Sequence, residues 1–209
     1  MSFLDEINND ISWRMSELAS IKTIPLRYHL LPEHKALLIK YSVPSIYALW
    51  EGFVKNAFGV YIREINKLAI PISDVHIDLL THTLSSIDKL SLENPRMSYR
   101  TKREFIEFYQ NTISLPLIIT DKLPTKSNVD FGVINEILIR FNLKQLPKSF
   151  EGGLKKLLRF RNSIAHGDIS IPVKMENIEF FSKLINDLMV EILLNIESGY
   201  NSKTFLKTI

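Results

Sequence analysis

The stretch I-Y-A-L-W-E-G-F-V-K-N-A-F-G-V-Y-I, residues 46–62, decides the fold of this chain. Its apolar residues occupy most sides of a helix, and such a helix has to be covered by neighbours all round. These residues are Ile46, Tyr47, Leu49, Trp50, Phe53, Val54, Ala57, Phe58, Tyr61 and Ile62. We therefore expect this helix at the centre of a helical bundle, with Trp50 and Phe53 in the core. Glu51 lies beside Tyr47 on the helical wheel, where a carboxylate needs a partner.

Further segments with helical spacing of apolar residues surround this stretch. They are residues 3–22, Pro32 to about Leu68, Asp74–Leu90, Lys102–Thr112, Val129–Leu143, Phe150–Ile164 and Lys174–Ile196. Pro25 is expected to break the first helix, Pro32 to begin the second, and Pro44 to kink or split it. Gly199 is expected to stop the last helix.

The pattern therefore predicts an all-α, single-domain bundle with a long central helix and peripheral helices. We assign residues 1–198 to this domain and residues 199–209 to a short, loosely held C-terminal tail. Residues 115–120 are apolar and β-branched and could form a short strand, but no nearby segment offers a clear partner. No internal repeat or low-complexity linker divides the chain.

Composition narrows the class of protein. The chain has 209 residues, of which 45% are hydrophobic and 23% charged, as is ordinary for a globular domain with a sizeable core. It has no cysteine, which excludes disulfides and thiolate sites and fits a cytoplasmic location. The acidic start, MSFLDEINND, does not resemble a signal peptide, and no apolar run reaches the roughly 18 residues of a membrane span. The net charge of +3 permits nucleic-acid binding without requiring it.

The second informative stretch is R-F-R-N-S-I-A-H-G-D, residues 159–168, at the end of the helix predicted over residues 150–164. Gly167 is placed to end this helix in a left-handed conformation. One side of the helix carries an apolar stripe of Leu154, Leu157, Leu158, Ile164 and Ala165. Arg161 falls in the middle of that stripe, so its guanidinium must be paired or line a cleft.

Polar residues gather beside this stripe. Asn162 and His166 are four residues apart and share a face, and Lys155 and Arg159 project near them. These residues can also be interpreted as purely structural. In that case Arg161 pairs with Glu51 inside the bundle and His166 caps the helix end. In that interpretation Lys155, Lys156 and Arg159 form a solvated face.

The motif R-N-x-x-A-H-G, formed by Arg161, Asn162, Ala165, His166 and Gly167, resembles the signature of the HEPN superfamily. In that signature an arginine and a polar residue are followed by a histidine after four to six intervening residues. The segment Tyr47–Lys55 is similar to the central helix of HEPN-like nucleases of the MAE and RiboL-PSP groups. The resemblance extends from the amino terminus to about Glu197, and outside these two segments it is one of helix order.

The resemblance implies a metal-independent endoribonuclease without a cofactor. The 2′-hydroxyl of the RNA would attack the adjacent phosphorus and leave a 2′,3′-cyclic phosphate. His166 would act as general acid or base, because an imidazole exchanges protons near neutral pH. Arg161 would stabilise the phosphoryl charge, Asn162 would orient the phosphate or the imidazole, and Glu51 would position Arg161. Lys155 and Arg159 could hold RNA phosphates.

A metal site is not indicated by the remaining histidines. His29 and His34 are five residues apart, and His76 and His82 are six apart, so neither pair aligns on a helix face. We expect these four side chains at the surface or at helix ends.

The resemblance also bears on partners. It implies the toxin of a toxin–antitoxin or antiviral defence system, controlled by an antitoxin or other regulatory protein. A homodimer would bring two copies of Arg161, Asn162 and His166 around one cleft. Phe160 lies away from the apolar stripe, where it could meet a second chain or the C-terminal tail. The alternative function is a non-catalytic HEPN module that binds RNA, a nucleotide or a partner protein.

Overall fold

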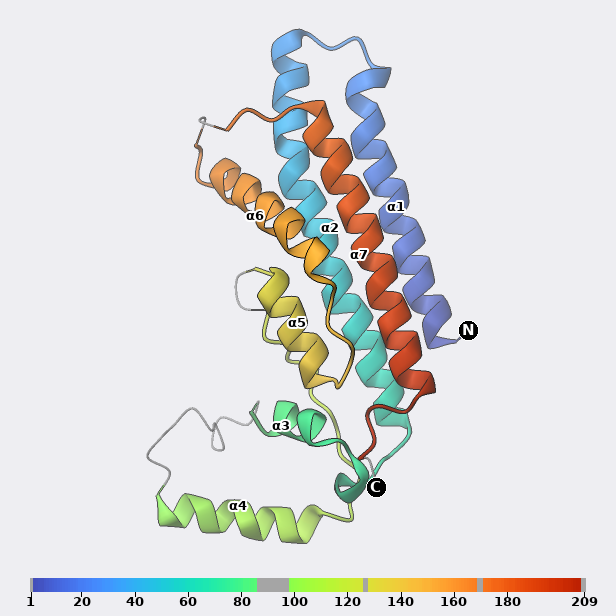
Figure 1. Cartoon of the computed structure of the whole chain (residues 1–209), viewed down its shortest axis with the longest axis vertical. Coiled ribbons are helices and arrows are strands. Elements are labelled where there is room, and N and C mark those ends of the chain that lie inside the picture. The colour runs from blue at the N-terminus through green and yellow to red at the C-terminus, as the bar shows by residue number, and fades with distance from the viewer. Residues whose placement is uncertain (1, 86–97, 126–127, 169–170, 208–209) are drawn as a thin grey trace. The chain divides into compact units, whose positions relative to one another are not determined.

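A computed structural model describes residues 2–85, 98–125, 128–168 and 171–207, and this part of the chain is all-α (Figure 1). The helices are α1 (Phe3–Arg27), α2 (Pro32–Lys67), α3 (Ile77–Ser85), α4 (Tyr99–Thr112), α5 (Phe131–Arg140), α6 (Glu151–Ala165) and α7 (Met175–Asn201). Two short 3₁₀ helices, η1 (Ile72–Asp74) and η3 (Lys148–Phe150), join them. Within the described ranges no strand is formed, and residues 115–120 contribute only an isolated bridge between Pro71 and Pro116. The predicted fold class is confirmed.

The three prolines that were expected to shape the first two helices have different effects on them. α2 begins at Pro32, as predicted, and continues through Pro44 without a break. The prediction that Pro25 breaks the first helix is wrong, since α1 includes Pro25 and ends at Arg27. A proline so near the end of a helix removes one backbone hydrogen bond, and the last turn still closes with Tyr28 N–H donating to the Ile24 carbonyl. Of the helix predicted over residues 74–90, the structure forms α3 from Ile77 to Ser85, while Asp74 ends η1 and residues 86–90 lie outside the described ranges.

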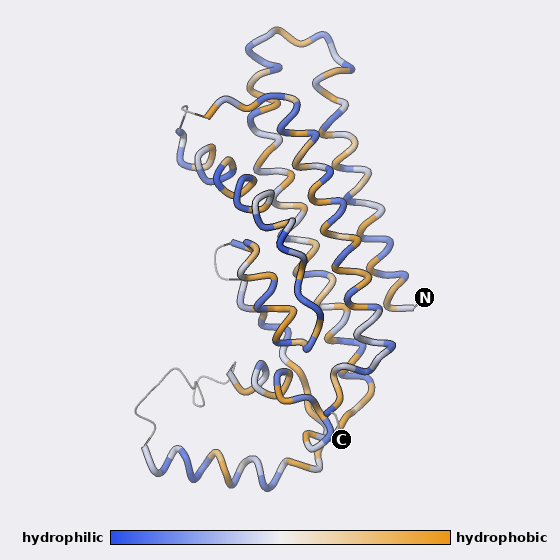
Figure 2. Tube along the Cα trace, in the orientation of Figure 1, coloured by the Kyte–Doolittle hydropathy of each residue, from blue (hydrophilic) through white to orange (hydrophobic). Residues whose placement is uncertain are grey.

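The chain forms two compact units, to both of which α2, α5 and α7 contribute. Unit 1 comprises Met1–Ala57, Thr125–Asn135 and Leu146–Leu194, and unit 2 comprises Phe58–Pro124, Glu136–Gln145 and Asn195–Ile209. Hydrophobic and hydrophilic residues alternate along α1 and α7 in step with the helical repeat, as Figure 2 shows. Each helix therefore has one face suited to a core and one suited to water.

Trp50 lies at the centre of unit 1. Its side chain is fully buried, and its Nε1–H donates to the Val129 carbonyl at 2.9 Å. The hydroxyl of Tyr47, also buried, accepts from the Val129 N–H at 2.7 Å. The backbone N–H and carbonyl of Val129, in the segment before α5, are thus both hydrogen-bonded to aromatic side chains of α2. This confirms the predicted core position of the Trp50 helix and fixes the segment that leads into α5.

A buried arginine joins α1 to α2. Arg14 is 8% exposed, forms a two-pronged ion pair with Asp10 and donates from Nη1 to the Leu49 carbonyl at 2.8 Å. Gly52 makes room for it, because a Cβ at that position would lie 2.9 Å from Nη1 of Arg14. The glycine at position 52 therefore serves close packing between two helices.

In unit 2, Phe141 is the centre of an aromatic cluster with Phe58, Tyr61 and His82. His82 is 1% exposed, and its Nε2–H donates to the Thr120 carbonyl at 3.0 Å. Burial is the largest cause that lowers the pKa of His82, so folding favours the neutral form of the ring. The expectation of a surface or capping position is therefore wrong for this histidine.

The described part of the carboxyl-terminal segment, residues 199–207, is packed within unit 2 rather than loosely held. Phe205 is 3% exposed, its carbonyl accepts from His76 N–H at 2.8 Å, and Lys207 N–H donates to the Asp74 carbonyl at 2.8 Å. Gly199 does not stop the last helix, which continues to Asn201. A Cβ at Gly199 would overlap the side chain of Leu143, so this glycine permits a close approach.

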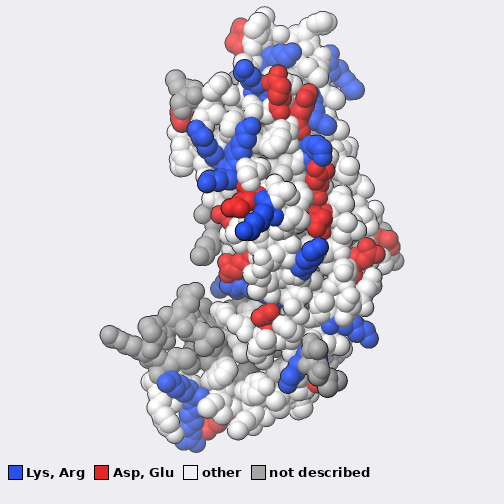
Figure 3. Space-filling view, in the orientation of Figure 1, with Lys and Arg blue, Asp and Glu red and all other residues white. Residues whose placement is uncertain are grey.

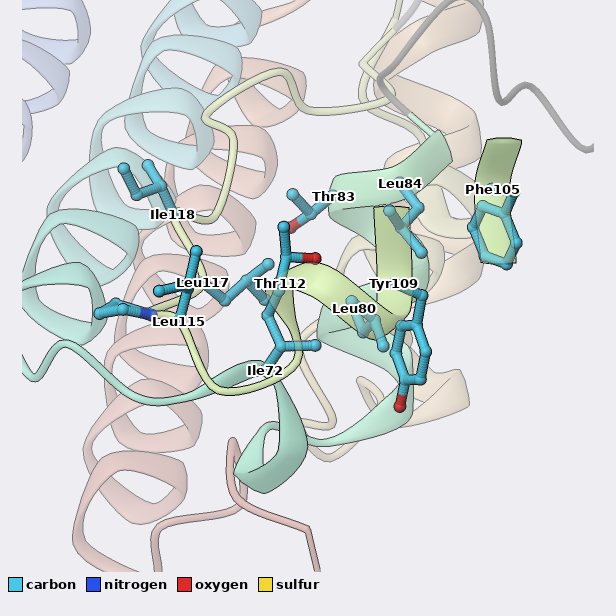
Figure 4. Close-up of a pocket in the computed structure, with 11 residues that line it drawn as sticks. Ile72, Leu80, Thr83, Leu84, Phe105, Tyr109, Thr112, Leu115, Leu117 and Ile118 are labelled. Carbon is cyan, nitrogen blue, oxygen red and sulfur yellow. The ribbon is translucent and has the colours of Figure 1, made fainter. Parts of the chain in front are cut away.

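Unit 2 also contains an apolar cavity of about 270 Å³ (Figure 4). Leu80 and Leu84 of α3 and Phe105 and Tyr109 of α4 line it, together with residues 115–118. None of its lining residues is charged, and it shares no residue with the site predicted from the sequence.

Among the described residues, no helix has the length and apolar character needed to cross a membrane.

Candidate active site

The carboxyl end of α6 has the geometry that the sequence predicted. Gly167 has a φ of 74°, in the left-handed region, and lies just past the helix cap His166. Gly167 N–H donates to the Ile164 carbonyl at 3.1 Å, and Asp168 N–H donates to the Ser163 carbonyl at 2.9 Å. These two bonds form a Schellman motif. The motif fixes the backbone at His166, whose side chain is exposed.

Arg161 is half-buried and is held from two sides. Its Nη1 donates to Oδ1 of Asn162 at 2.8 Å and to Oδ1 of Asn128 at 3.2 Å. Its Cζ lies 5.0 Å from the centre of the Tyr47 ring, in a cation–π contact. An arginine on an apolar helix face is thus satisfied by two amide oxygens and an aromatic face.

The guanidinium of Arg161 retains donors for a ligand. It has five N–H groups, and among the described residues both of its hydrogen bonds come from Nη1. Nη2 and Nε are the pair that can grip two oxygens of a phosphate in a planar fork. The contacts with Asn128 and Tyr47 therefore orient Arg161 without consuming the part of it that would bind an anion.

Tyr47 contacts Arg161 as a neutral phenol. Burial, and to a smaller extent the Glu51 carboxylate, raises the pKa of Tyr47 to about 12, against opposing effects of the Val129 N–H and of Arg161. The phenol is therefore neutral at physiological pH. The sequence placed Tyr47 in the core by its apolar character, and only its position one helical turn before Glu51 hinted at a polar surrounding.

Glu51 does not pair with Arg161. Its Oε1 accepts from Lys55 Nζ at 2.6 Å, one turn along the same helix. A partner at the i+4 position needs no tertiary arrangement, so this pair forms locally. Glu51 also affects Tyr47, whose pKa it raises through its negative charge and a side-chain hydrogen bond, and the ring of Tyr47 in turn contacts Arg161. The pairing of Arg161 with Glu51, considered from the sequence, is thus absent from the contacts of the described residues.

Asn162 contacts Arg161 through its side chain and His166 through the backbone of the helix. Its side-chain oxygen accepts from Arg161, and its backbone carbonyl accepts from the His166 N–H at 3.0 Å. Its side-chain oxygen thus contacts the guanidinium, and the role toward the phosphate or the imidazole that the sequence suggested stays a prediction. Asn128 also contacts the guanidinium and was missed, because a polar residue in a loop carries no sequence signal of what it contacts.

The apolar stripe of α6 is largely as predicted. Leu154, Leu157 and Ile164 are buried and Leu158 is half-buried. Ala165 is exposed, because the helix ends there and the chain turns away from the core at Gly167.

Basic side chains cover the outer side of α6. Figure 3 shows lysine and arginine gathered over this helix. Lys155 and Arg159, predicted to contact RNA, are exposed. Lys156 instead directs its ammonium toward three rings, with Nζ 5.1 Å from the ring centre of Phe180. Lys155 and Arg159 therefore remain the cations of α6 most open to a ligand.

Phe160 packs against its own chain. Its ring packs edge-on against Phe181 of α7, with ring centres 5.4 Å apart. The helical wheel shows that Phe160 lies off the apolar stripe. It cannot show that α7 covers that side of α6. Its contact with α7 removes Phe160 as an argument for a dimer, and it is not a contact with the C-terminal tail.

A family model described as HEPN_MAE_28990-like HEPN matches residues 3–205, nearly the whole chain. No curated protein and no solved structure gives a significant match.

Proposed function

Because the chain belongs to the MAE_28990-like HEPN family, a family of nuclease-like or RNA-related modules, we propose that it is a metal-independent endoribonuclease. One observation carries this proposal. The guanidinium of Arg161 is oriented by Asn128, Asn162 and Tyr47, its Nη2 and Nε form no hydrogen bond among the described residues, and the exposed His166 follows at the end of the same helix. A fixed cationic fork and a proton-exchanging ring at the end of one helix suit phosphoryl transfer.

The proposed reaction uses the RNA's own nucleophile. The 2′-oxygen forms a bond to the adjacent phosphorus as it loses its proton, and the bond from phosphorus to the 5′-oxygen breaks as that oxygen gains a proton. The products are a 2′,3′-cyclic phosphate and a 5′-hydroxyl. His166 takes part in one of the two proton transfers. Arg161 donates to the non-bridging oxygens, whose negative charge grows in the transition state.

The structure gives Arg161 an orientation before substrate binds. A donor that is already aimed costs no reorganisation at the moment of reaction, which is why preorganised donors contribute strongly to catalysis. Lys155 and Arg159 add positive potential on the same helix and are proposed to hold flanking phosphates. We assign the chain the role of a toxin, either of a toxin–antitoxin pair or of an antiviral defence system.

Comparison of RNA with DNA of the same sequence tests this proposal. The purified protein is expected to cut the RNA and to leave the DNA intact, because DNA lacks the 2′-hydroxyl. Cleavage of both at comparable rates would contradict attack by that group. RNA binding without cleavage would favour the alternative of a non-catalytic module.

We propose that the working form is a homodimer in which the ends of two α6 helices face each other. One chain supplies one Arg161 and one His166, whereas the reaction needs two proton transfers and support for several phosphate oxygens. Light scattering is expected to give the mass of a dimer. Activity per wild-type chain should fall steeply when His166→Ala protein is co-expressed in excess, and it should not fall when Arg103→Ala protein is. A monomer that retains full activity would contradict the composite site.

A further inference from the structure

A recess lies along α6, beginning one helical turn before Arg161. Its volume is about 350 Å³, within the range of about 300–1,000 Å³ that is usual for ligand sites. It belongs entirely to unit 1 and is formed where the beginning of α5 meets the first half of α6. Its lining residues are Asp130, Phe131, Gly132, Glu151, Lys155 and Leu158.

The recess is tied to the candidate active site. Asn128, which accepts from Arg161, lies two residues before the first lining residue, Asp130. Between them, Val129 is fixed by its bonds to Trp50 and Tyr47. Asp130 caps α5, with its Oδ1 accepting from Val133 N–H at 2.8 Å. Tyr47 therefore takes part both in holding the segment before α5 and in orienting Arg161.

The lining combines an aromatic ring, a carboxylate and an ammonium group. Phe131 and Leu158 are half-buried and offer apolar surface to a flat group, while Glu151 and Lys155 are exposed. Among the described residues neither Glu151 nor Lys155 forms an ion pair, although they are four apart on one helix. One wall of α6 thus presents an acceptor and a donor next to apolar surface, which are the elements that bind unstacked RNA bases.

We propose that this recess binds a guanine base of the RNA next to the scissile phosphate, which rests on the proposed function of the adjacent site. Guanine presents two neighbouring donors, N1–H and the N2 amino group, which match the two oxygens of the Glu151 carboxylate. Its O6 and N7 are acceptors that match the Lys155 ammonium. Phe131 packs against the face of the base.

The other bases fit this set of groups less well. Adenine and cytosine place a ring acceptor beside their amino group, so only one of the two carboxylate oxygens finds a donor. Uracil places a carbonyl on each side of its N3–H, and both would face the negative charge. Asp130 is the weaker candidate for reading the base, because Oδ1 is already used by the cap of α5.

The test compares wild type with Glu151→Gln on RNA oligonucleotides that differ only in one nucleotide, guanosine or adenosine. The wild type is expected to cut next to guanosine at least about tenfold faster, and Glu151→Gln to bring the two rates close together. The matched control is Glu176→Gln, which removes another exposed first-turn carboxylate, at the start of α7. It should leave the preference unchanged. Thermal melting of all three proteins confirms that the fold is intact.

A second readout does not depend on cleavage. Guanosine monophosphate and adenosine monophosphate are titrated into His166→Ala protein, followed by NMR shifts of the backbone amides of residues 130–132 and 151–158. Tighter binding of the guanine nucleotide, lost on adding Glu151→Gln, supports the pocket even if no RNA is cut, and in that case only the proposed nuclease fails. RNA cleavage without base preference, or equal binding of both nucleotides, overturns the guanine pocket and leaves the proposed nuclease standing.

Discussion

Replacing His166 with alanine is expected to lower the rate of RNA cleavage by at least about 100-fold, the usual contribution of a positioned general acid or base. His166 is the only histidine of the motif, and its side chain is exposed at a helix end whose backbone is fixed by the Schellman bonds. Alanine fits the same backbone conformation, so the melting temperature should remain close to that of the wild type. Loss of activity in a folded protein would locate the defect in chemistry.

The matched control for this substitution is His34→Ala, which removes an exposed histidine from the first turn of α2. It should retain full activity. In cells, induction of the wild type is expected to stop growth if the chain acts as a toxin, and induction of His166→Ala should permit it. Cleavage by His166→Ala at a rate near that of the wild type would remove the catalytic assignment of this residue.

Arg161→Ala is expected to lower the cleavage rate by about 100-fold or more, as does the loss of other preorganised donors to a transition-state anion. Arg161→Lys should recover little of it, because an ammonium keeps the charge but lacks the planar fork. The alanine variant should also lose about 1–2 kcal/mol of stability through its hydrogen bonds and the contact with Tyr47. Glu51 adds nothing to this loss, since its carboxylate is paired with Lys55.

The comparison variant is Arg103→Ala, in which an exposed arginine of α4 loses its pairing with Glu107. Its activity and its free energy of unfolding, measured by urea titration, should stay close to those of the wild type. Single-turnover rates at saturating RNA separate a loss of chemistry from a loss of binding. An Arg161→Lys protein as active as the wild type would contradict the role of the guanidinium fork.

The central helix could be predicted from the sequence because its signal is local and strong. Apolar residues all round residues 46–62 leave no stable arrangement except burial, and the structure buries Trp50 and Phe53 completely. The end of α6 could be predicted equally well, because a glycine directly after the last helical turn is typical of a left-handed helix cap. Gly167 has the expected positive φ. Both conclusions depend on neighbours within a few residues.

The partners of Arg161 could not be predicted in the same way. The helical wheel showed that an arginine on the apolar stripe needs partners, but any polar residue in the fold could have met that need. Glu51 was the natural candidate by charge, yet Lys55 is available to it without any tertiary contact. Asn128 lies in a loop and reaches Arg161 only because Trp50 and Tyr47 hold Val129 beside it.

The packing of the carboxyl-terminal segment could not be predicted from the sequence for a different reason. Few residues follow the last helix, and short polar termini are usually loose. A single apolar side chain, Phe205, is enough to reverse that expectation when unit 2 offers it a buried position. Whether such a position exists is a property of the fold and cannot be read from the segment itself.

The most direct test of the proposed chemistry is to incubate the purified protein with a defined RNA in excess EDTA and to identify the new ends by mass spectrometry. Undiminished cleavage is expected, because the nucleophile belongs to the RNA and the charge is stabilised by Arg161. The expected ends are 2′,3′-cyclic phosphate and 5′-hydroxyl, and no product is expected when the reacting nucleotide carries a 2′-O-methyl group. A strict requirement for added magnesium or manganese, or ends that carry a 5′-phosphate, would contradict it.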